Sequence, residues 1–290
     1  MSFFAGKIAV ITGAGSGIGR GLAVALNRAG CVLELSDINT EALVETRAAL
    51  ERKELAFHLE QVDVADRSAM EQWAAAVGER RQRVDIVVNN AGVALGGNAE
   101  DNSIEDIEWL MGINFWGVVY GCKAFLPWLR KSPAAHLVNI SSVFGIIAVP
   151  TQSAYNAAKF AVRGYTEALR QELADSSIHV CCVHPGGVQT NIARAARTDH
   201  DAEQAAEFAD RFEEMAKTSP DSAAEQIMNA MLRRKKRLLI GHDAKLITLI
   251  SRLFPVSYPR VLGWFSGTDV KSIVEGKEHA PGKEPGVQQQ

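Results

Sequence analysis

Short aliphatic and β-branched runs alternate with stretches of helical periodicity along most of this 290-residue chain. Runs of this length suit strands that are buried on both faces, and each segment between them is long enough for a helix. Such alternation is typical of a parallel sheet with helices on both faces and right-handed crossovers. The sequence therefore predicts an α/β fold built on a doubly wound parallel sheet. Strands are expected at residues 7–11, 31–35, 56–62, 84–88, 136–140, 178–183 and 237–240, and helices at 18–28, 40–52, 68–77, 104–129, 153–173 and 223–233.

Composition places the chain among ordinary globular proteins. It is 47% hydrophobic and 22% charged, with a mean hydropathy of -0.03, which argues against disorder and against a fibrous structure. The formal net charge of -3 provides no field that would attract nucleic acid, so we expect no nucleic-acid partner. No apolar run approaches the roughly 20 residues of a spanning helix, and the N-terminal run is too short for a secretory signal. We therefore expect a cytoplasmic protein.

The four cysteines contain no C-x-x-C pair; they are Cys31, Cys122, Cys181 and Cys182. Their spacing suits neither a zinc ribbon nor a disulfide framework. We therefore expect reduced, buried thiols and no metal site.

A glycine-rich turn, T-G-A-G-S-G-I-G at residues 12–19, lies between the first expected strand and the first expected helix. Backbone N–H groups and a helix N-terminus at such a turn are suited to hold a pyrophosphate. The spacing matches T-G-x-x-x-G-x-G rather than the more common G-x-G-x-x-G. The turn predicts a Rossmann-type nucleotide site, and a tight turn without a ligand is the alternative.

The second expected strand ends at Asp37, eighteen residues after Gly19. This is close to the offset of about 20 residues at which an acid binds the ribose hydroxyls of NAD. A carboxylate there repels the 2′-phosphate of NADP, and neither Ser16 nor Ile38 supplies a compensating cation. The sequence therefore predicts NAD in preference to NADP, and an ordinary surface aspartate at a strand end is the alternative.

Tyr155 and Lys159 form a Y-x-x-x-K pair whose i,i+4 spacing places both side chains on one helix face. A phenol with an ordinary pKa of about 10 is a weak base near neutral pH, and an adjacent ammonium favours its phenolate. Ser142 follows the fifth expected strand, thirteen residues before Tyr155, and its hydroxyl is suited to polarise the same substrate oxygen. The neighbouring Ser141 is the less well-spaced alternative.

Together the ordered motifs resemble those of the short-chain dehydrogenase/reductase family. They are residues 12–19, Asp63-Val64, residues 89–92, Asn114, Ser142, Tyr155, Lys159 and residues 185–190, and the resemblance covers roughly residues 5–190, with a looser match to about 241. It implies that Tyr155 is the acid/base, that Lys159 lowers its pKa and holds the nicotinamide ribose, and that Ser142 orients the substrate oxygen. It also implies that Asn114 positions a water that relays protons to Lys159.

The resemblance further implies a set of cofactor contacts. Asp63 and Val64 would touch adenine, Asn90 and Ala91 the adenine-side ribose, and Val188 and Thr190 the nicotinamide amide and the phosphates. The predicted cofactor-binding residues are Gly13, Ser16, Gly17, Ile18, Gly19, Asp37, Asp63, Val64, Asn90, Ala91, Gly92, Tyr155, Lys159, Pro185, Gly186, Val188 and Thr190.

The length suits one Rossmann-type domain over residues 1–290 with two additions. Residues 1–190 form the expected cofactor-binding and catalytic core, 191–219 a substrate lid with one or two helices, and 220–243 the last helix and strand. Residues 244–274 form an apolar extension. Pro255 and Pro259 interrupt it, so residues 244–266 cannot be one straight helix. This extension would cap the pocket or lie between subunits, with peripheral membrane contact the less favoured alternative. Residues 275–290 are expected to be a disordered tail.

Apolar residues stand where the family builds the wall opposite the nicotinamide: Ala94, Leu95, Val143, Phe144, Val149 and Pro150. They favour a hydrophobic secondary alcohol or ketone, lipid-, steroid- or terpenoid-like, although core packing would explain them equally well. The predicted function is an NAD-dependent oxidoreductase that works as a homotetramer or homodimer on a small-molecule substrate. Three alternatives stay open: an NADP-dependent carbonyl reductase, an epimerase or dehydratase, and a catalytically silent cofactor-binding protein.

Overall fold

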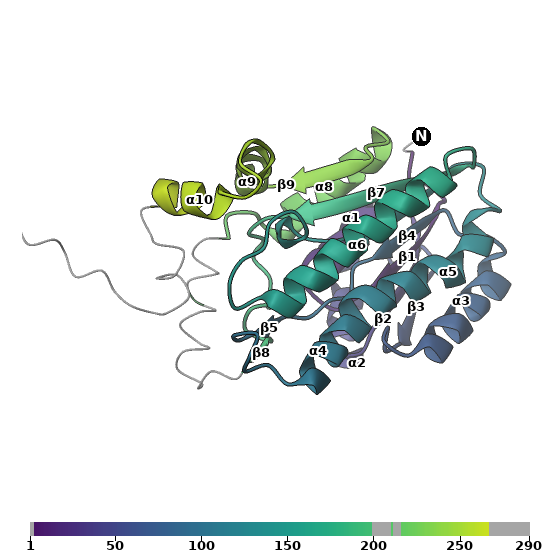
Figure 1. The fold of residues 1–290 in the computed structure, drawn as a ribbon. Coiled ribbons are helices and arrows are strands. Elements are labelled where there is room, and N and C mark those ends of the chain that lie inside the picture. Colours follow the sequence, from purple (N-terminus) through teal and green to yellow (C-terminus); the bar gives the residue numbers. More distant parts are fainter. Residues whose placement is uncertain (1–2, 199–209, 211–215, 267–290) are drawn as a thin grey trace, which may run out of the picture.

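A central sheet of seven parallel strands organises the protein (Figure 1). The computed structural model describes residues 3–198, 210 and 216–266. The strand order is β3-β2-β1-β4-β6-β7-β9, and every neighbouring pair is parallel. The strands are β1 (Ile8–Thr12), β2 (Val32–Asp37), β3 (Phe57–Gln61), β4 (Ile86–Asn89), β6 (Ala135–Ile140), β7 (Ile178–Pro185) and β9 (Arg237–Ile240). The predicted doubly wound sheet is confirmed.

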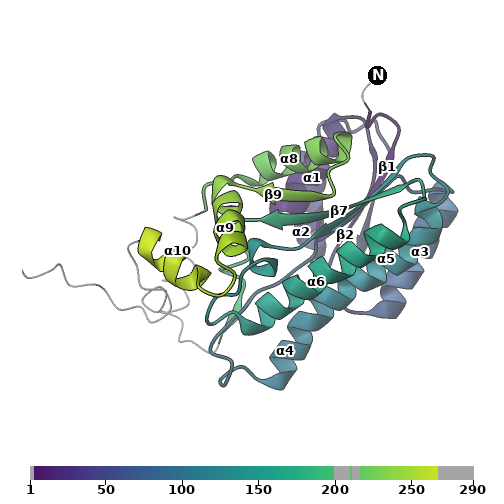
Figure 2. The ribbon, with the colours of Figure 1, turned by 45° about the horizontal axis from the view of Figure 1, so that its top comes forward.

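Helices cover both faces of the sheet (Figure 2). One face carries α1 (Gly17–Arg28), α2 (Thr40–Ala49) and α8 (Pro220–Leu232), and the other carries α3 (Arg67–Arg81), α5 (Gly117–Leu129) and α6 (Ser153–Glu172). Two buried apolar clusters fill the two faces, one around Leu22 and Leu33 and the other around Trp73 and Phe125. Because both faces are buried, the strands read as continuous apolar runs, which is why the sequence located them.

Side-chain caps define where several helices begin. Asn39 accepts from the Ala42 backbone at the start of α2, Asp66 caps α3, and Ser219 caps α8 just before Pro220. Short polar residues of this kind pair with amide groups that the first turn of a helix leaves unsatisfied.

The predicted helix over residues 104–129 is not continuous. The structure has α4 (Ile104–Met111), a π-helical turn at Gly112–Trp116 and then α5. The wider turn coincides with Asn114, whose side-chain amide donates to the Val93 carbonyl and whose Oδ1 accepts from the Val93 amide, both at 2.8 Å. Helical periodicity over this stretch gives no sign of such a long-range anchor.

Two features lie outside the seven-stranded sheet. A small parallel pair, β5 (Leu95–Gly96) and β8 (Arg197–Thr198), was not predicted, because two-residue strands have no sequence pattern. The apolar extension divides into α9 (His242–Leu253) and α10 (Tyr258–Ser266), which confirms that it is not one straight helix. The predicted helices of the lid and the predicted disordered tail lie largely or wholly outside the described residues.

All four cysteines are buried and free, as predicted. No helix in the described part of the chain is long and apolar enough to cross a membrane.

Candidate active site

The sheet reverses its winding between β1 and β4. From β1 the chain adds β2 and β3 on one side and then returns to place β4 on the other. In such sheets ligands bind in the crevice outside the carboxyl ends of the strands at this switch point. Thr12 ends β1 here, and Asn89 ends β4.

The glycine turn after β1 is packed too closely for side chains. Gly13 and Gly17 have φ values of 63° and 50°, which favour glycine. A Cβ at Gly19 would overlap the Gly13 carbonyl oxygen, and one at Gly17 would lie 2.9 Å from Thr190 Cγ2. The turn therefore brings its backbone against the segment that follows β7, which places Thr190 beside the predicted phosphate site.

The N-terminus of α1 points its amide groups out of this turn. Its N-cap residue, Ser16, makes no side-chain capping hydrogen bond, and the first turn carries no acidic residue. A helix N-terminus with its dipole uncompensated in this way suits a phosphate group. The turn and helix therefore fit the pyrophosphate of a dinucleotide.

Asp37 closes the other side of the turn. Its Oδ2 accepts from the Gly15 amide at 2.8 Å, and its Oδ1 accepts from the Asn39 amide at 3.0 Å. The next side chain, Ile38, is 61% exposed. Arg20 also reaches this region: its guanidinium donates to the Gly15 carbonyl oxygen and pairs with Glu45 at 2.7 Å. The sequence reasoning did not consider this nearby cation.

Asn90 ties the end of β4 to the turn after β1. Its side-chain amide donates to the carbonyl oxygens of Thr12 and Gly13 at 3.0 Å, and its backbone amide donates to Thr12 Oγ1 at the same distance. The amide of Ala91 also donates to that hydroxyl. The Asn90 side chain is thus committed to shaping the glycine turn, and its predicted contact with the ribose stays a prediction.

The adenine end of the predicted site follows β3. Asp63 Oδ1 accepts from the Ala65 amide at 2.9 Å. Val64 is buried, and its side chain packs where a Cβ on Gly117 would collide with it. The predicted contact of Val64 with adenine stays a prediction.

The α6 face brings the predicted catalytic side chains together. Lys159 is 3% exposed and Ser142 is 9% exposed. The Lys159 ammonium lies 5.5 Å from the centroid of the Tyr155 ring and donates to the Ile140 carbonyl at 3.3 Å. A Cβ at Gly92 would lie 3.1 Å from Asn114 Oδ1 and 3.4 Å from Lys159 Nζ. Gly92 therefore lies between these two polar groups.

Burial dominates the ionisation of this pair. It raises the pKa of Tyr155 to about 12, against the smaller opposing effect of a hydrogen bond with Ser142. Burial also lowers the pKa of Lys159 to about 8. The net shift of Tyr155 is upward because the removal of water from the phenolate outweighs the hydrogen bond with Ser142; that Lys159 lowers the pKa of Tyr155 stays a prediction.

The Lys159 shift gives a prediction about stability. The pKa of Lys159 is about 8 in the fold against an ordinary 10.5, so between these values the unfolded chain binds more protons and stability rises with pH. Below pH 8 both states are protonated, and the penalty of the buried charge is fully present. The Lys159→Met variant should therefore resist urea better than the wild type at pH 7, by up to about 3 kcal/mol. Its advantage should disappear by pH 10.5; an advantage that is constant with pH would contradict the assignment.

The Pro-Gly turn after β7 completes the crevice. Pro185 ends β7, Val188 is buried, and the Gly186 amide donates to the Ile240 carbonyl at 3.0 Å. The preceding His184 is wholly buried, and its Nδ1 lies 2.9 Å from the Ser142 carbonyl oxygen. His184 thus links β7 to the backbone of the candidate catalytic serine.

The predicted substrate wall separates into core and surface parts. Leu95 and Val143 are buried, and Leu95 packs with Leu110 and the start of α6, so these two belong to the core. Phe144 is half-buried, with its ring edge-on to Tyr155 at 6.2 Å, and Val149 is also half-buried. Ala94 is half-buried and Pro150 is exposed, so these two remain with Phe144 and Val149 as candidates for substrate contact.

The described start of the predicted lid is anchored beside this wall. Arg197 of β8 pairs with Asp106 at 2.8 Å and lies 3.7 Å from the centroid of the Trp109 ring. Most of the remainder, residues 199–209 and 211–215, lies outside the described residues.

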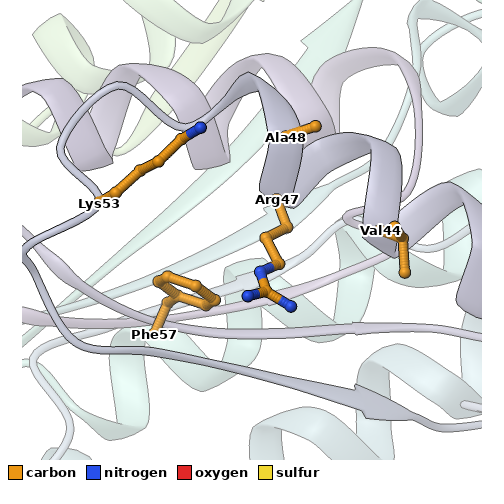
Figure 3. Close-up of a pocket in the computed structure, with 5 residues that line it drawn as sticks. All are labelled: Val44, Arg47, Ala48, Lys53 and Phe57. Atoms are coloured by element: carbon orange, nitrogen blue, oxygen red, sulfur yellow. The ribbon is translucent and has the colours of Figure 1, made fainter.

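A separate surface pocket of about 320 Å³ lies between α2 and the start of β3 (Figure 3). Its lining residues are Val44, Arg47, Ala48, Lys53 and Phe57, none of which is a predicted site residue. This pocket is thus distinct from the candidate active site, whose residues lie at the carboxyl ends of the strands.

Comparison with known proteins agrees with this geometry. The family model for short chain dehydrogenases matches residues 7–201. The chain belongs to the short-chain dehydrogenase/reductase family. As a member, it is an oxidoreductase that interconverts a CH–OH group and a carbonyl with NAD(P).

Individual relatives match over most of their length. The chain is 47% identical over 265 residues to SadH of Mycobacterium tuberculosis, whose name assigns it to the oxidoreductases; the match covers 90% of this chain and 96% of SadH. It is 35% identical over 207 residues to a 3-ketodihydrosphingosine reductase of Bacteroides thetaiotaomicron, covering 71% and 73% of the two chains. A Burkholderia phymatum short-chain dehydrogenase/reductase solved in complex with NAD has a TM-score of 0.81 at 31% identity, with 89% and 96% coverage.

Within the predicted motif at residues 89–92, Asn89 donates to Asn139 Oδ1 at 2.8 Å beneath the crevice. The sequence did not single out three other residues that shape the site. His184 contacts Ser142 as described, and Asp243 and Tyr258 reach the site from the C-terminal extension. A buried polar residue at the end of a strand was the available signal for His184, but the two residues of the extension had none.

Proposed function

We propose that this enzyme transfers a hydride between NAD and a hydrophobic secondary alcohol or the corresponding ketone. The observation that carries the proposal is the cluster of buried Ser142 and Lys159 with half-buried Tyr155 at the carboxyl edge of a Rossmann sheet, together with a turn that fits a pyrophosphate. A nicotinamide supplies the hydride acceptor or donor when bound, and the protein provides orientation and proton transfer.

The proposed mechanism assigns one task to each side chain. In alcohol oxidation the Tyr155 oxygen takes the hydroxyl proton, while the Ser142 hydroxyl hydrogen-bonds the same substrate oxygen and holds it in place. The Lys159 ammonium stabilises the phenolate and is held by the Ile140 carbonyl. In ketone reduction Tyr155 returns the proton. Asn114 fixes the loop at Val93 beside Lys159, and a water held there would relay protons to solvent.

The preference for NAD is proposed from Asp37. Its carboxylate is held by two backbone amides at the end of β2, where it would accept from ribose hydroxyls and repel a 2′-phosphate. Arg20 is the nearby cation, and its pairing with Glu45 weakens its attraction for a phosphate. Two structural relatives were solved with NAD and another with 5-hydroxy-NADP, so the preference rests on Asp37.

The Ile38→Arg variant tests the cofactor preference. It adds a cation at the exposed position after Asp37 without removing the two hydrogen bonds of that carboxylate. We expect its kcat/KM for NADP to rise about tenfold, the effect of one good phosphate contact, with little change for NAD. Val44→Arg, on the exposed surface of α2, is the matched control. A wild type that prefers NADP would overturn the assignment.

A hydrophobic substrate is supported by two observations. Half-buried Phe144 lies edge-on to Tyr155, with half-buried Val149 in the loop that follows it, and one relative is named for reduction of a sphingoid ketone. The test is the formation of NADH with a panel of secondary alcohols, from small polyols to long-chain and steroid alcohols. We expect turnover to increase with apolar size; activity confined to small polyols would contradict this proposal.

We also propose a homodimer or homotetramer. Exposed Trp116 and Phe160, at 47% and 40%, lie on the two helical segments that carry Asn114 and Tyr155. Light scattering of the purified protein gives the number of subunits, and a monomer would contradict the proposal.

A further inference from the structure

The C-terminal extension lies at the carboxyl ends of β7 and β9, which is the same edge of the sheet as the candidate active site (Figure 2). Its two helices, α9 and α10, follow the last strand directly. Two polar side chains of this extension, Asp243 and Tyr258, hydrogen-bond to backbone on two different loops of the site. These contacts distinguish it from an extension that merely lies against the fold.

Asp243 binds the Pro-Gly turn on the cofactor side. Its Oδ2 accepts from the Gly187 amide at 2.7 Å. The carboxylate occupies the space that a Cβ on Gly186 or on Gly241 would fill, and Gly241 has a φ of 94°. Two glycines therefore make room for this one carboxylate, which belongs to the first turn of α9.

The position of this turn matters for the proposed cofactor site. Three residues beyond Gly187 the chain reaches Thr190, whose methyl group packs against Gly17 of the phosphate-binding turn. Val188 between them is buried and pairs with Thr218. A shift of the Pro-Gly turn would therefore be transmitted to the phosphate-binding turn through packed atoms.

Tyr258 binds the loop on the substrate side. Its hydroxyl donates to the Ala148 carbonyl at 3.1 Å and accepts from the Ala148 amide at 2.9 Å. Ala148 lies between Ser142 and Tyr155, in the loop that also carries Val149. The Asn156 side chain of α6 donates to the Val149 carbonyl at 2.8 Å and holds the next residue of the same loop. Tyr258 thus fixes the outer wall of the proposed substrate site.

We propose that the α9–α10 extension positions the active site at two separate points. Asp243 sets the position of the Pro-Gly turn and so the affinity for NAD, and Tyr258 sets the position of the 146–151 loop and so the affinity for the alcohol or ketone. Neither residue touches a reacting atom; both are positioning residues. The assignment of the two affinities rests on the proposed function, whereas the two contacts themselves do not.

The two contacts predict losses of affinity for two different ligands. Asp243→Ala removes the acceptor of the Gly187 amide and should raise the Kd for NAD about tenfold, with KM for the alcohol little changed. Asp243→Asn keeps one acceptor oxygen and should restore most of the affinity. Tyr258→Phe keeps the ring but removes the hydroxyl, and should raise KM for the alcohol about fivefold to tenfold, with the Kd for NAD and kcat unchanged.

The experiment measures these constants on the full chain. NAD affinity is measured by titration calorimetry, KM and kcat by NADH absorbance with the best alcohol of the panel, and amide hydrogen exchange over residues 146–151 by mass spectrometry. Lys245→Ala and Arg260→Ala are the controls, because these residues are exposed on the same two helices. All control constants should match the wild type.

The outcomes separate this inference from the proposed function. If no alcohol is turned over, calorimetry and hydrogen exchange still apply: Asp243→Ala should weaken NAD binding, and Tyr258→Phe should speed exchange of the 146–151 loop. A Tyr258→Phe variant that exchanges like the wild type, or an Asp243→Ala variant that binds NAD normally, would overturn the inference. Equal losses of both affinities in both variants would also overturn it, since they would indicate general loosening of the fold.

Discussion

Replacement of Tyr155 with phenylalanine is expected to lower kcat by about 10²–10⁴-fold, the range that a positioned acid or base contributes. The ring is retained, so its edge-on contact with Phe144 should persist, and the Lys159 ammonium should stay over the ring. What is lost is the oxygen that exchanges a proton with the substrate. NAD affinity, measured by calorimetry, should stay within about twofold of the wild type, which is well below the 1.4 kcal/mol of a tenfold change.

The control for this variant is Tyr165→Phe. Tyr165 belongs to the same helix, is half-buried, and has its pKa raised to about 12 mainly by burial, as Tyr155 does. It packs edge-on to Phe115 and is not itself a predicted site residue. Tyr165→Phe should keep near-normal kcat. Normal turnover by Tyr155→Phe would refute the mechanism, whatever the behaviour of the control.

Gly19→Ala should abolish measurable NAD binding and destabilise the fold. Its Cβ would overlap the Gly13 carbonyl oxygen and lie 2.6 Å from the Asn90 side-chain nitrogen. Neither the turn nor α1 has room to move, because α1 packs on α8 and the Asn90 side-chain amide binds the carbonyls of the turn. Overpacking of this kind costs about 1–3 kcal/mol. Urea unfolding and calorimetry measure the two effects.

Gly164→Ala provides the matched control, since Gly164 lies within α6 with nothing within 4 Å of its Cβ position. A glycine in a helix interior is less stable than alanine by roughly 0.5–1 kcal/mol. This variant should therefore be slightly more stable than the wild type and should bind NAD normally. If Gly19→Ala behaved in the same way, the close-packed turn would not be the phosphate site.

Local patterns in the sequence accounted for much of the site. The glycine spacing reflects close backbone contacts inside the turn at residues 12–19, such as that of Gly19 with the Gly13 carbonyl. The Y-x-x-x-K spacing places two side chains on one helix face whatever surrounds the helix. The ends of the buried strands were readable because parallel strands are apolar on both faces. These features of the sequence predict that Ser142, Tyr155 and Lys159 share one crevice.

Other features were decided by contacts between distant parts of the chain. The π-helical turn at Asn114 depends on Val93, and the pair β5–β8 joins residues about a hundred positions apart. The raised pKa of Tyr155 depends on how much water the packed site excludes, which spacing does not record. The hydrogen bond from the Asn90 side-chain amide to the Thr12 carbonyl also joins residues far apart in the sequence.

The sequence by itself determined the sheet, the glycine-rich turn and the candidate catalytic side chains, because each is a short-range pattern set by backbone geometry and burial. Only the tertiary structure decided how the extension is used. The contact of Tyr258 with Ala148 spans 110 residues, and that of Asp243 with Gly187 spans 56. Such contacts have no local periodicity, since they arise only when the folded sheet brings the two segments to the same edge.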